Sequence, residues 1–271
     1  MIENTYGLGK RLDYIAGVIE RLRPARVLDA GCGTGANLTA PLAGRFPATV
    51  FVGTDSDAAS IAYARQANRH ANVSYLADAE AGEIGTFDLV IASEVIEHVD
   101  DPDAFLDALQ SRLNAGGKLL LTLPNGYGPF EFAALFEAVL RTTGIYGALR
   151  ALKRALRGAP TGGGSSDTLA VSPHINFFSY RSIRELIAGR GLTVLDYRAR
   201  TFLCGFGFDQ ILQSPRAVAW NAAIADRLPP QMVSDWMFLL EGGGARRPPA
   251  YCRGACARAR RYLNERRRQA A

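Results

Sequence analysis

The segment Glu94-Val-Ile-Glu97-His98 carries two carboxylates and an imidazole within five residues. Spacings of three and four residues place these side chains on one side of a helical turn. A distant histidine, His174, offers a fourth group. Because carboxylate oxygens and imidazole nitrogens bind divalent metal ions, Glu94, Glu97, His98 and His174 are candidate metal ligands.

A metal at these residues would hold two oxygens of a substrate and lower the pKa of the attacking hydroxyl. Two other interpretations stay open. His98 or His174 acts as a general base without a metal, with Glu97 as the third candidate catalytic residue. Alternatively, Glu97 is a solvated helix residue and His98 caps or packs a helix. The remaining histidine, His70, is expected at the surface.

A second group of residues is typical of nucleotide binding. Asp29-Ala-Gly31-Cys-Gly33-Thr-Gly35 lies between a predicted strand and a predicted helix. Glycines there let the backbone turn sharply and let a ligand approach it closely, and the helix that follows offers free N–H groups. Asp55 ends the next strand, where a carboxylate can accept both hydroxyls of a ribose.

The position of Asp29 discriminates between two nucleotides. Gly31, Gly33 and Ala36 satisfy a loose dinucleotide fingerprint, and Asp55 lies at the distance expected for NAD. Asp29 precedes the first glycine by two residues and would repel a pyrophosphate. It would attract the ammonium group of S-adenosylmethionine, so the second cofactor is favoured.

The elements that must position these residues alternate along the chain. Short apolar runs predict strands, and apolar residues at helical spacing predict helices. The predicted strands are Arg26–Ala30, Thr49–Thr54, Val73–Ala77, Phe87–Ala92, Lys118–Leu123, Thr193–Ala199 and Val233–Leu240. The predicted helices span residues 10–23, 36–43 and 58–69, a segment after Pro102, and 180–190. This alternation predicts a mostly parallel sheet with right-handed crossovers.

Four motifs in this order carry a family resemblance. VLDAGCGTG (27–35), VGTDSD (52–57), FDLVIASEVIEHVDDP (87–102) and GGKLLLTLPN (116–125) resemble the motifs of class I S-adenosylmethionine-dependent methyltransferases. The chain is similar to the group that contains the ubiquinone-pathway O-methyltransferases and the type 11 and type 23 methyltransferases. The resemblance is good over about residues 25–125 and loose over 172–197.

This resemblance implies S-adenosylmethionine as the cofactor and assigns residues to it. Gly31 and Gly33 would approach the cofactor backbone, Asp55 the ribose, and Asp78 and Ala79 the adenine, with Ser93 lining the pocket. The predicted cofactor-binding residues are Asp29, Gly31, Gly33, Gly35, Asp55, Ser56, Asp78, Ala79 and Ser93. The pattern of Glu94, Glu97, His98 and a later histidine also resembles ubiquinone-pathway O-methyltransferases and the small-RNA 3′-terminal methyltransferase, in which such residues are associated with magnesium.

The predicted fold class is α/β: a Rossmann-like, doubly wound, mostly parallel seven-stranded sheet with an antiparallel last strand and a helical lid insertion. The predicted divisions are an N-terminal helix (1–24), a cofactor-binding core (25–125), a helical lid (126–171), the rest of the core (172–241) and a basic C-terminal tail (242–271). In the lid, residues 147–158 are basic and amphipathic. They are interpreted as a surface helix or as a peripheral membrane contact.

The charge and the cysteine content of the chain limit its expected partners and its expected compartment. The chain has a net charge of +5, and nine arginines against one acid give residues 246–271 a charge of +8. Such a tail can contact phosphate, although a solvated terminal helix is the simpler interpretation. The chain has only four cysteines and no evident export signal, so we expect it in the reducing cytoplasm, with its cysteines as free thiols and not as a disulfide framework. Cys252 and Cys256 have no second Cys/His pair nearby, so a zinc site is not expected there.

The predicted function is methyl transfer to an oxygen of a small molecule that resembles a quinone precursor or a glycan. An RNA methyltransferase and a non-catalytic cofactor-binding protein are the alternatives. No combined aromatic and basic platform for RNA is evident, so nucleic acid is not the expected partner. Five aromatic residues are candidates for an acceptor wall or for packing between lid and body: Tyr127, Phe130, Phe132, Phe177 and Phe178.

Overall fold

The computed structural model of the 271-residue chain describes most of the predicted core. The described residues are 7–82, 84–129, 174–204, 212, 214–249, 251–255, 257–259 and 262. Nearly all of the predicted lid, including residues 147–158, lies outside them. The aromatic residues Phe130 and Phe132 also lie outside the described residues.

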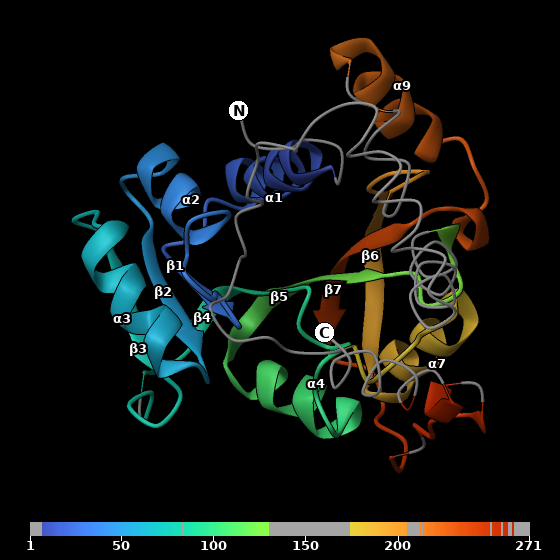
Figure 1. The fold of residues 1–271 in the computed structure, drawn as a ribbon. Coiled ribbons are helices and arrows are strands. Elements are labelled where there is room, and N and C mark those ends of the chain that lie inside the picture. The colour runs from blue at the N-terminus through green and yellow to red at the C-terminus, as the bar shows by residue number, and fades with distance from the viewer. Residues whose placement is uncertain are drawn as a thin grey trace.

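A seven-stranded sheet forms the centre of the molecule (Figure 1). Its strands are β1 (Arg26–Ala30), β2 (Val50–Asp55), β3 (Val73–Ala77), β4 (Phe87–Ser93), β5 (Leu113–Pro124), β6 (Leu192–Ala199) and β7 (Asp235–Gly242). Their order is β3-β2-β1-β4-β5-β7-β6. The pairs from β3 to β5 are parallel, whereas β7 pairs antiparallel with both β5 and β6. The predicted mostly parallel sheet with an antiparallel last strand is therefore confirmed.

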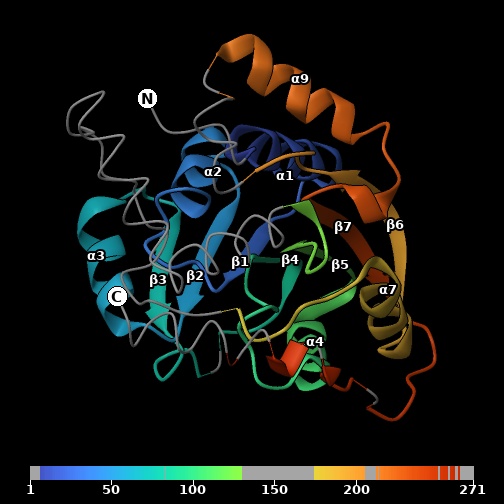
Figure 2. The same ribbon diagram turned by 45° about the vertical axis from the view of Figure 1, so that its right-hand side comes forward.

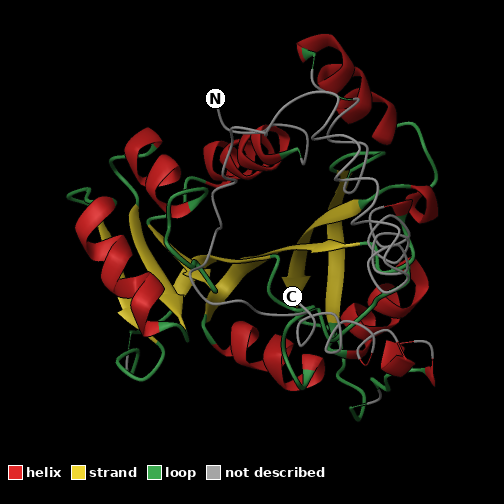
Figure 3. Cartoon of the chain, viewed as in Figure 1, coloured by secondary structure: helices red, strands yellow, loops and turns green. Residues whose placement is uncertain are grey.

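Helices cover both faces of this sheet, which Figure 3 shows as a layer of strands between two layers of helices. The described helices are α1 (Leu8–Leu22), α2 (Thr39–Arg45), α3 (Ala58–Ala67), α4 (Pro102–Ser111), α7 (Tyr180–Gly189), α9 (Pro215–Ala225) and the short 3-10 helix η2 (Pro230–Met232). Helices α1 and α2 pack on one face, and α4 and α7 on the other. Helix α9 lies beyond α1 in Figures 1 and 2. The two helices are connected by Lys10, whose Nζ donates a hydrogen bond to Ala222 O and pairs with Asp226.

Alternation along the central strands explains why they read as continuous apolar runs. In β4, Leu89 and Ile91 pack with α1 and α2, whereas Val90 and Ala92 pack with α4 and α7. All four side chains are fully buried. A strand that is covered on both faces has no polar face to show, as expected for the parallel part of such a sheet.

Side-chain caps begin the helices that follow the site strands. Asp57 accepts hydrogen bonds from Ala59 N and Ser60 N at the start of α3. Asp101 accepts one from Ala104 N at the start of α4, and Pro102 follows it. These caps satisfy N–H groups that a helix leaves open at its first turn. They fix where the chain leaves the carboxyl ends of β2 and β4.

The observed boundaries differ from the predicted ones mainly beside the glycine segment. The helix predicted over 36–43 begins at Thr39, because residues 36–38 belong to the turn that encloses the site. Strand β5 begins at Leu113, so the predicted turn at 114–117 lies within it as an irregularity in the register with β4.

Two further findings concern the whole described part of the chain. Cys32, Cys204 and Cys252 are free thiols, while Cys256 lies outside the described residues. A search of the described residues finds no helix of the length and apolarity that a membrane crossing requires.

Candidate active site

One cavity of about 990 Å³ opens at the carboxyl ends of β1, β2 and β4. Ligands of doubly wound sheets bind at this edge, where the strand order reverses. Seven of the nine predicted cofactor-binding residues line it: Asp29, Gly31, Gly33, Asp55, Ser56, Asp78 and Ser93. Gly35 and Ala79 do not line it. The candidate acceptor-side residues Glu94, Glu97, His98 and His174 line the same cavity.

The glycine segment, residues 29–35, is fixed in place by hydrogen bonds to the end of β2. Gly31 N and Cys32 N both donate to Thr54 O, at 2.7 and 2.9 Å. Gly31 has φ 78°, and a Cβ there would lie 2.4 Å from Val95 Cγ2. Both the left-handed backbone and this close approach require glycine. Gly35 does a different job from the one predicted, since its missing Cβ leaves room for the Tyr75 ring.

Asp55 closes the loop from the side of β2. Its Oδ2 accepts a hydrogen bond from Gly33 N at 2.8 Å, and its Oδ1 accepts one from Asp57 N at 2.8 Å. Each carboxylate oxygen keeps a further lone pair, so the group is oriented and still able to accept two hydroxyls. Asp78 lies nearby, and burial together with the charge of Asp55 raises its pKa.

Asp29 is buried, with 2% of its surface exposed. Thr39 donates a hydrogen bond from Oγ1 to Asp29 Oδ2 at 2.5 Å, which fixes the carboxylate at the wall of the cavity. Cys32 lines the cavity beside it. Burial raises the pKa of the Cys32 thiol far above its ordinary value, with Asp29 adding to the effect. The thiol is therefore neutral and is not a nucleophile.

The structure brings Glu97, His98 and His174 together, and we call them the acceptor cluster. Each offers a ligand atom within 4.8 Å of the others. The two imidazole rings meet edge to face with centroids 4.9 Å apart, and His98 Nε2 lies 3.8 Å from Glu97 Oε1. Within the described part of the chain, this is the group whose geometry suits a metal ion.

Glu97 is the buried carboxyl group of the acceptor cluster. Its side chain is 1% exposed, and its carboxylate oxygens accept no hydrogen bond from any residue that the structure describes. Burial, and then the charge of Glu94, raise the pKa of Glu97 to about 8. The alternative in which Glu97 is a solvated helix residue is therefore wrong. A buried carboxyl group without partners is costly and is typical of functional sites.

The residues 94–98 form a bend and a turn, not the helical turn that the spacing predicted. Glu94 has φ 60°, a left-handed conformation that is uncommon outside glycine. The turn is held by the segment after the lid, because Ile175 N and Asn176 N both donate to Glu97 O, at 2.8 and 3.0 Å. These bonds bring His174 next to His98, although 75 residues separate them in the sequence.

Glu94, the fourth predicted ligand, is turned away from the acceptor cluster. Its Oε1 accepts a hydrogen bond from Thr122 Oγ1 at 2.8 Å, and its Oε2 lies 3.3 Å from Arg200 Nη2. Burial acts to raise the pKa of Glu94, but Arg200 and Arg11 outweigh it, and the pKa is lowered. Glu94 is therefore an ionised partner of arginine in this structure.

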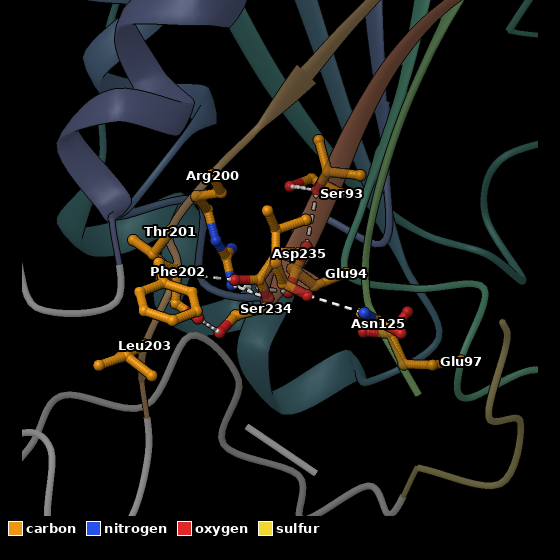
Figure 4. Close-up of polar contacts among 12 residues, drawn as sticks. Ser93, Glu94, Glu97, Asn125, Arg200, Thr201, Phe202, Leu203, Ser234 and Asp235 are labelled. Carbon is orange, nitrogen blue, oxygen red and sulfur yellow. Dashed lines mark hydrogen bonds and ion pairs between the residues drawn. The ribbon is translucent and has the colours of Figure 1, made fainter. Parts of the chain in front are cut away.

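Arg200 and Asp235 form an ion pair that was not predicted from the sequence. Arg200 Nη2 lies 2.6 Å from Asp235 Oδ1, and both residues line the cavity beside Glu94 (Figure 4). Burial raises the pKa of Asp235 to about 6, although Arg200 opposes the shift. The two residues follow β6 and begin β7, so only the antiparallel pairing of those strands makes them neighbours. The sequence offered one signal for this pair, which is an opposite charge at the end of β6 and at the start of β7.

The cavity as a whole is acidic. Its described lining contains two arginines, Arg11 and Arg200, and seven carboxylates: Asp29, Asp55, Asp57, Asp78, Glu94, Glu97 and Asp235. Such a wall attracts a cationic ligand or a metal ion and repels a pyrophosphate.

The sequence of the chain matches a known protein family. A family model described as "Methyltransferase domain" matches residues 3–197, more than half of the chain. The ubiquinone biosynthesis O-methyltransferase of Xanthomonas euvesicatoria pv. vesicatoria (strain 85-10) is 34% identical over 119 residues. This match covers 42% of the chain and 49% of that protein. The chain thus spans about half the length of the curated relatives it matches.

Solved structures share the fold at low sequence identity. An S-adenosylmethionine-dependent methyltransferase from Clostridium acetobutylicum ATCC 824 has a TM-score of 0.51 and 12% identity, over 90% of this chain and 93% of that one. The [4+2]-cyclase SpnF has a TM-score of 0.51 and 16% identity, over 86% of this chain and 82% of that one. These likenesses establish the Rossmann-like fold alone, since one fold hosts different reactions.

Proposed function

Because the chain belongs to the class I S-adenosylmethionine-dependent methyltransferases, we propose that it transfers the methyl group to an oxygen of a small molecule. A molecule that resembles a quinone precursor is the favoured acceptor, since the curated relatives that match part of the chain are ubiquinone biosynthesis O-methyltransferases. A glycan-like acceptor is the second small-molecule class that the sequence leaves open.

The observation that carries this proposal is the acceptor cluster at the wall of the same cavity as the glycine segment. Methyl transfer forms a bond from the acceptor oxygen to the methyl carbon and breaks the bond from that carbon to sulfur. The hydroxyl proton must leave, and S-adenosylhomocysteine remains. His98 and His174 provide two imidazoles that can receive this proton, and Glu97, whose carboxyl group lies beside them, is the third candidate catalytic residue. Alignment of the two reactants supplies the rest of the rate enhancement.

The cofactor side of the cavity supports the same proposal. The buried Asp29 and the oriented Asp55 suit the ammonium group and the ribose hydroxyls of S-adenosylmethionine. Asp78 and Ser56 line the wall where adenine and ribose would lie. The acidic lining favours the net positive charge that this cofactor carries and S-adenosylhomocysteine lacks at sulfur.

The donor set of the acceptor cluster also fits a divalent metal ion. Glu97, His98 and His174 would hold it, and when bound the ion would lower the pKa of the acceptor hydroxyl. Two imidazoles and one carboxylate suit a transition-metal ion better than magnesium, which prefers oxygen ligands. Magnesium remains a prediction of the sequence resemblance, and Glu94 would have to leave Arg200 to become a fourth ligand.

The test is transfer of radiolabelled methyl from S-adenosylmethionine into bacterial cell extract, with and without EDTA, followed by partition between organic and aqueous phases. We expect label in the organic phase that resists alkali, because a methyl ether is stable to alkali and a methyl ester is not. Loss of that label with EDTA would show that a metal takes part, and its persistence would show that the transfer proceeds without a metal that EDTA removes. Nuclease-sensitive label would overturn the proposal in favour of RNA. Binding of S-adenosylhomocysteine without any transfer would identify a non-catalytic protein.

A further inference from the structure

We propose that Arg253 is a positioning residue for the acceptor cluster, and that the segment around it, residues 251–255, completes the site from outside. This inference rests on the proposed function, because it assumes that Glu97, His98 and His174 face the acceptor. The family model ends at residue 197, so the segment lies beyond the part of the chain that the family defines. The sequence alone favoured a solvated basic tail here.

The guanidinium group of Arg253 joins the two chain segments that carry the acceptor cluster. Its Nε donates a hydrogen bond to Asn176 Oδ1 at 2.8 Å, two residues after His174. Its Nη2 donates to Val99 O at 3.3 Å and also to Asp100 O, directly after His98. Residues 97–100 and 174–176 are far apart in sequence, and Arg253 contacts both.

Asn176 makes the connection between these segments rigid. Only 2% of its surface is exposed. Its Nδ2 donates to Ile96 O at 3.0 Å and to Val99 O at 2.7 Å, on either side of Glu97 and His98. Because Nδ2 must face these two carbonyl groups, Oδ1 faces outward and needs a donor. Arg253 supplies that donor and so satisfies a buried acceptor at the back of the turn.

The segment is anchored on the fold on both sides of Arg253. Tyr251 N donates to Asp103 Oδ2 at 3.0 Å, and the ring of Tyr251 packs on that of Phe178 with centroids 5.1 Å apart. Asp103 also pairs with the buried Arg190, at 3.2 Å. After Arg253, Ala257 is 3% exposed. These contacts hold the arginine at a fixed place behind the acceptor cluster.

An arginine is needed at this position because of its geometry. The planar guanidinium directs several N–H groups at fixed angles, which lets one side chain reach Asn176 and two backbone carbonyls together. A lysine has a single nitrogen and can hold only part of this set. Arg258, five residues after Arg253, is exposed, so Arg258→Ala removes the same charge from a solvated side chain and serves as the matched control.

The first arm of the experiment needs no acceptor. The chain has three histidines, and each gives a ring signal in a proton–carbon spectrum. In the presence of EDTA, Arg253→Ala is expected to move the signals of His98 and His174 and to leave that of the exposed His70 in place. Arg258→Ala should move none of them. Three unchanged signals in Arg253→Ala would overturn the inference, and so would a shift of all three, which indicates a general disturbance.

The second arm measures the reaction. Arg253→Ala should lower kcat at least tenfold, while the affinity for S-adenosylmethionine, measured by calorimetry, stays within twofold of the unmodified protein. Arg253→Lys should recover part of kcat, and Arg258→Ala should retain all of it. An unchanged kcat in Arg253→Ala overturns the inference. If the unmodified protein transfers no methyl group at all, the proposed function fails, and the histidine signals still decide whether Arg253 positions the acceptor cluster.

Discussion

Replacement of Glu97 by glutamine tests whether ionisation of this buried carboxyl group lowers the free energy of unfolding as pH rises. Glu97 is 1% exposed and its carboxylate lacks hydrogen-bond partners among the described residues. Burial, followed by the charge of Glu94, raises its pKa from 4.5 to about 8. Glutamine has nearly the same shape and never ionises, so the change removes the titration and leaves the packing.

The expected effect follows from the difference in proton binding between the folded and unfolded chains. Between about pH 5 and pH 8 the unfolded chain has lost the Glu97 proton while the folded chain keeps it, so stability falls as pH rises. The stabilising contribution is fully present below the unfolded pKa and is lost as pH rises through the folded pKa. A shift from 4.5 to about 8 corresponds to a loss of about 3 kcal/mol across this window. Glu97→Gln should lack this loss.

The assay is urea unfolding of both proteins at several pH values from about 5 to 8, with EDTA present to keep metal ions away. Subtraction of the two curves removes the titration of groups that are distant from Glu97. We expect the free energy of unfolding of Glu97→Gln to exceed that of the unmodified protein increasingly toward high pH. Parallel curves would refute the reasoning, because Glu97 would then titrate alike in the folded and unfolded chains.

Three further changes test the rest of the site. Asp55→Ala should weaken S-adenosylmethionine binding by about 100-fold in calorimetry, because two charge-assisted hydrogen bonds to the ribose are lost; unchanged affinity at an unchanged circular dichroism spectrum would contradict the ribose assignment. Gly31→Ala should lower the free energy of unfolding in urea by about 2 kcal/mol or more, since the backbone at Gly31 is left-handed and the new Cβ meets Val95. The added change Val95→Ala should restore only part of that stability. Full restoration would show that backbone strain is negligible. Arg200→Met should destabilise the fold by about 3–5 kcal/mol because it leaves both Asp235 and Glu94 without their shared cation; the added change Asp235→Asn should recover part of this loss, and no recovery at all would show that Asp235 is not coupled to Arg200.

The cofactor half of the site was predictable because its residues are set by local chain geometry. Gly31 needs a left-handed backbone and Asp55 ends a strand, and both features are visible in short motifs. The alternation of apolar runs with helices fixed the parallel sheet for the same reason. The start of α2 was placed too early, because the turn after Gly35 has the composition of a helix but closes the site.

The acceptor half depended on contacts between distant parts of the chain. The spacing of Glu94, Glu97 and His98 predicted one helical face, but the left-handed backbone of Glu94 sends its side chain to Arg200. His174 joins the acceptor cluster through backbone bonds to Glu97 O, which no local pattern reveals. Arg200 and Asp235 become neighbours only through antiparallel pairing. The sequence therefore singled out the two histidines and Glu97, which the structure brings together, but it gave no prediction of the ion pair beside them.

The place of β7 has a consequence for how the protein is made. Among the strands that the structure describes, β7 comes last in the sequence, yet it lies between β5 and β6. While the ribosome has synthesised only the residues before Asp235, β5 has an open edge and β6 has no neighbouring strand to pair with. Arg200 then lacks its carboxylate partner as well. The parallel part of the sheet can therefore form earlier in translation, whereas the ion pair of Arg200 and Asp235 must wait for β7. Chains released before β7 would expose two unpaired strands, which favours aggregation.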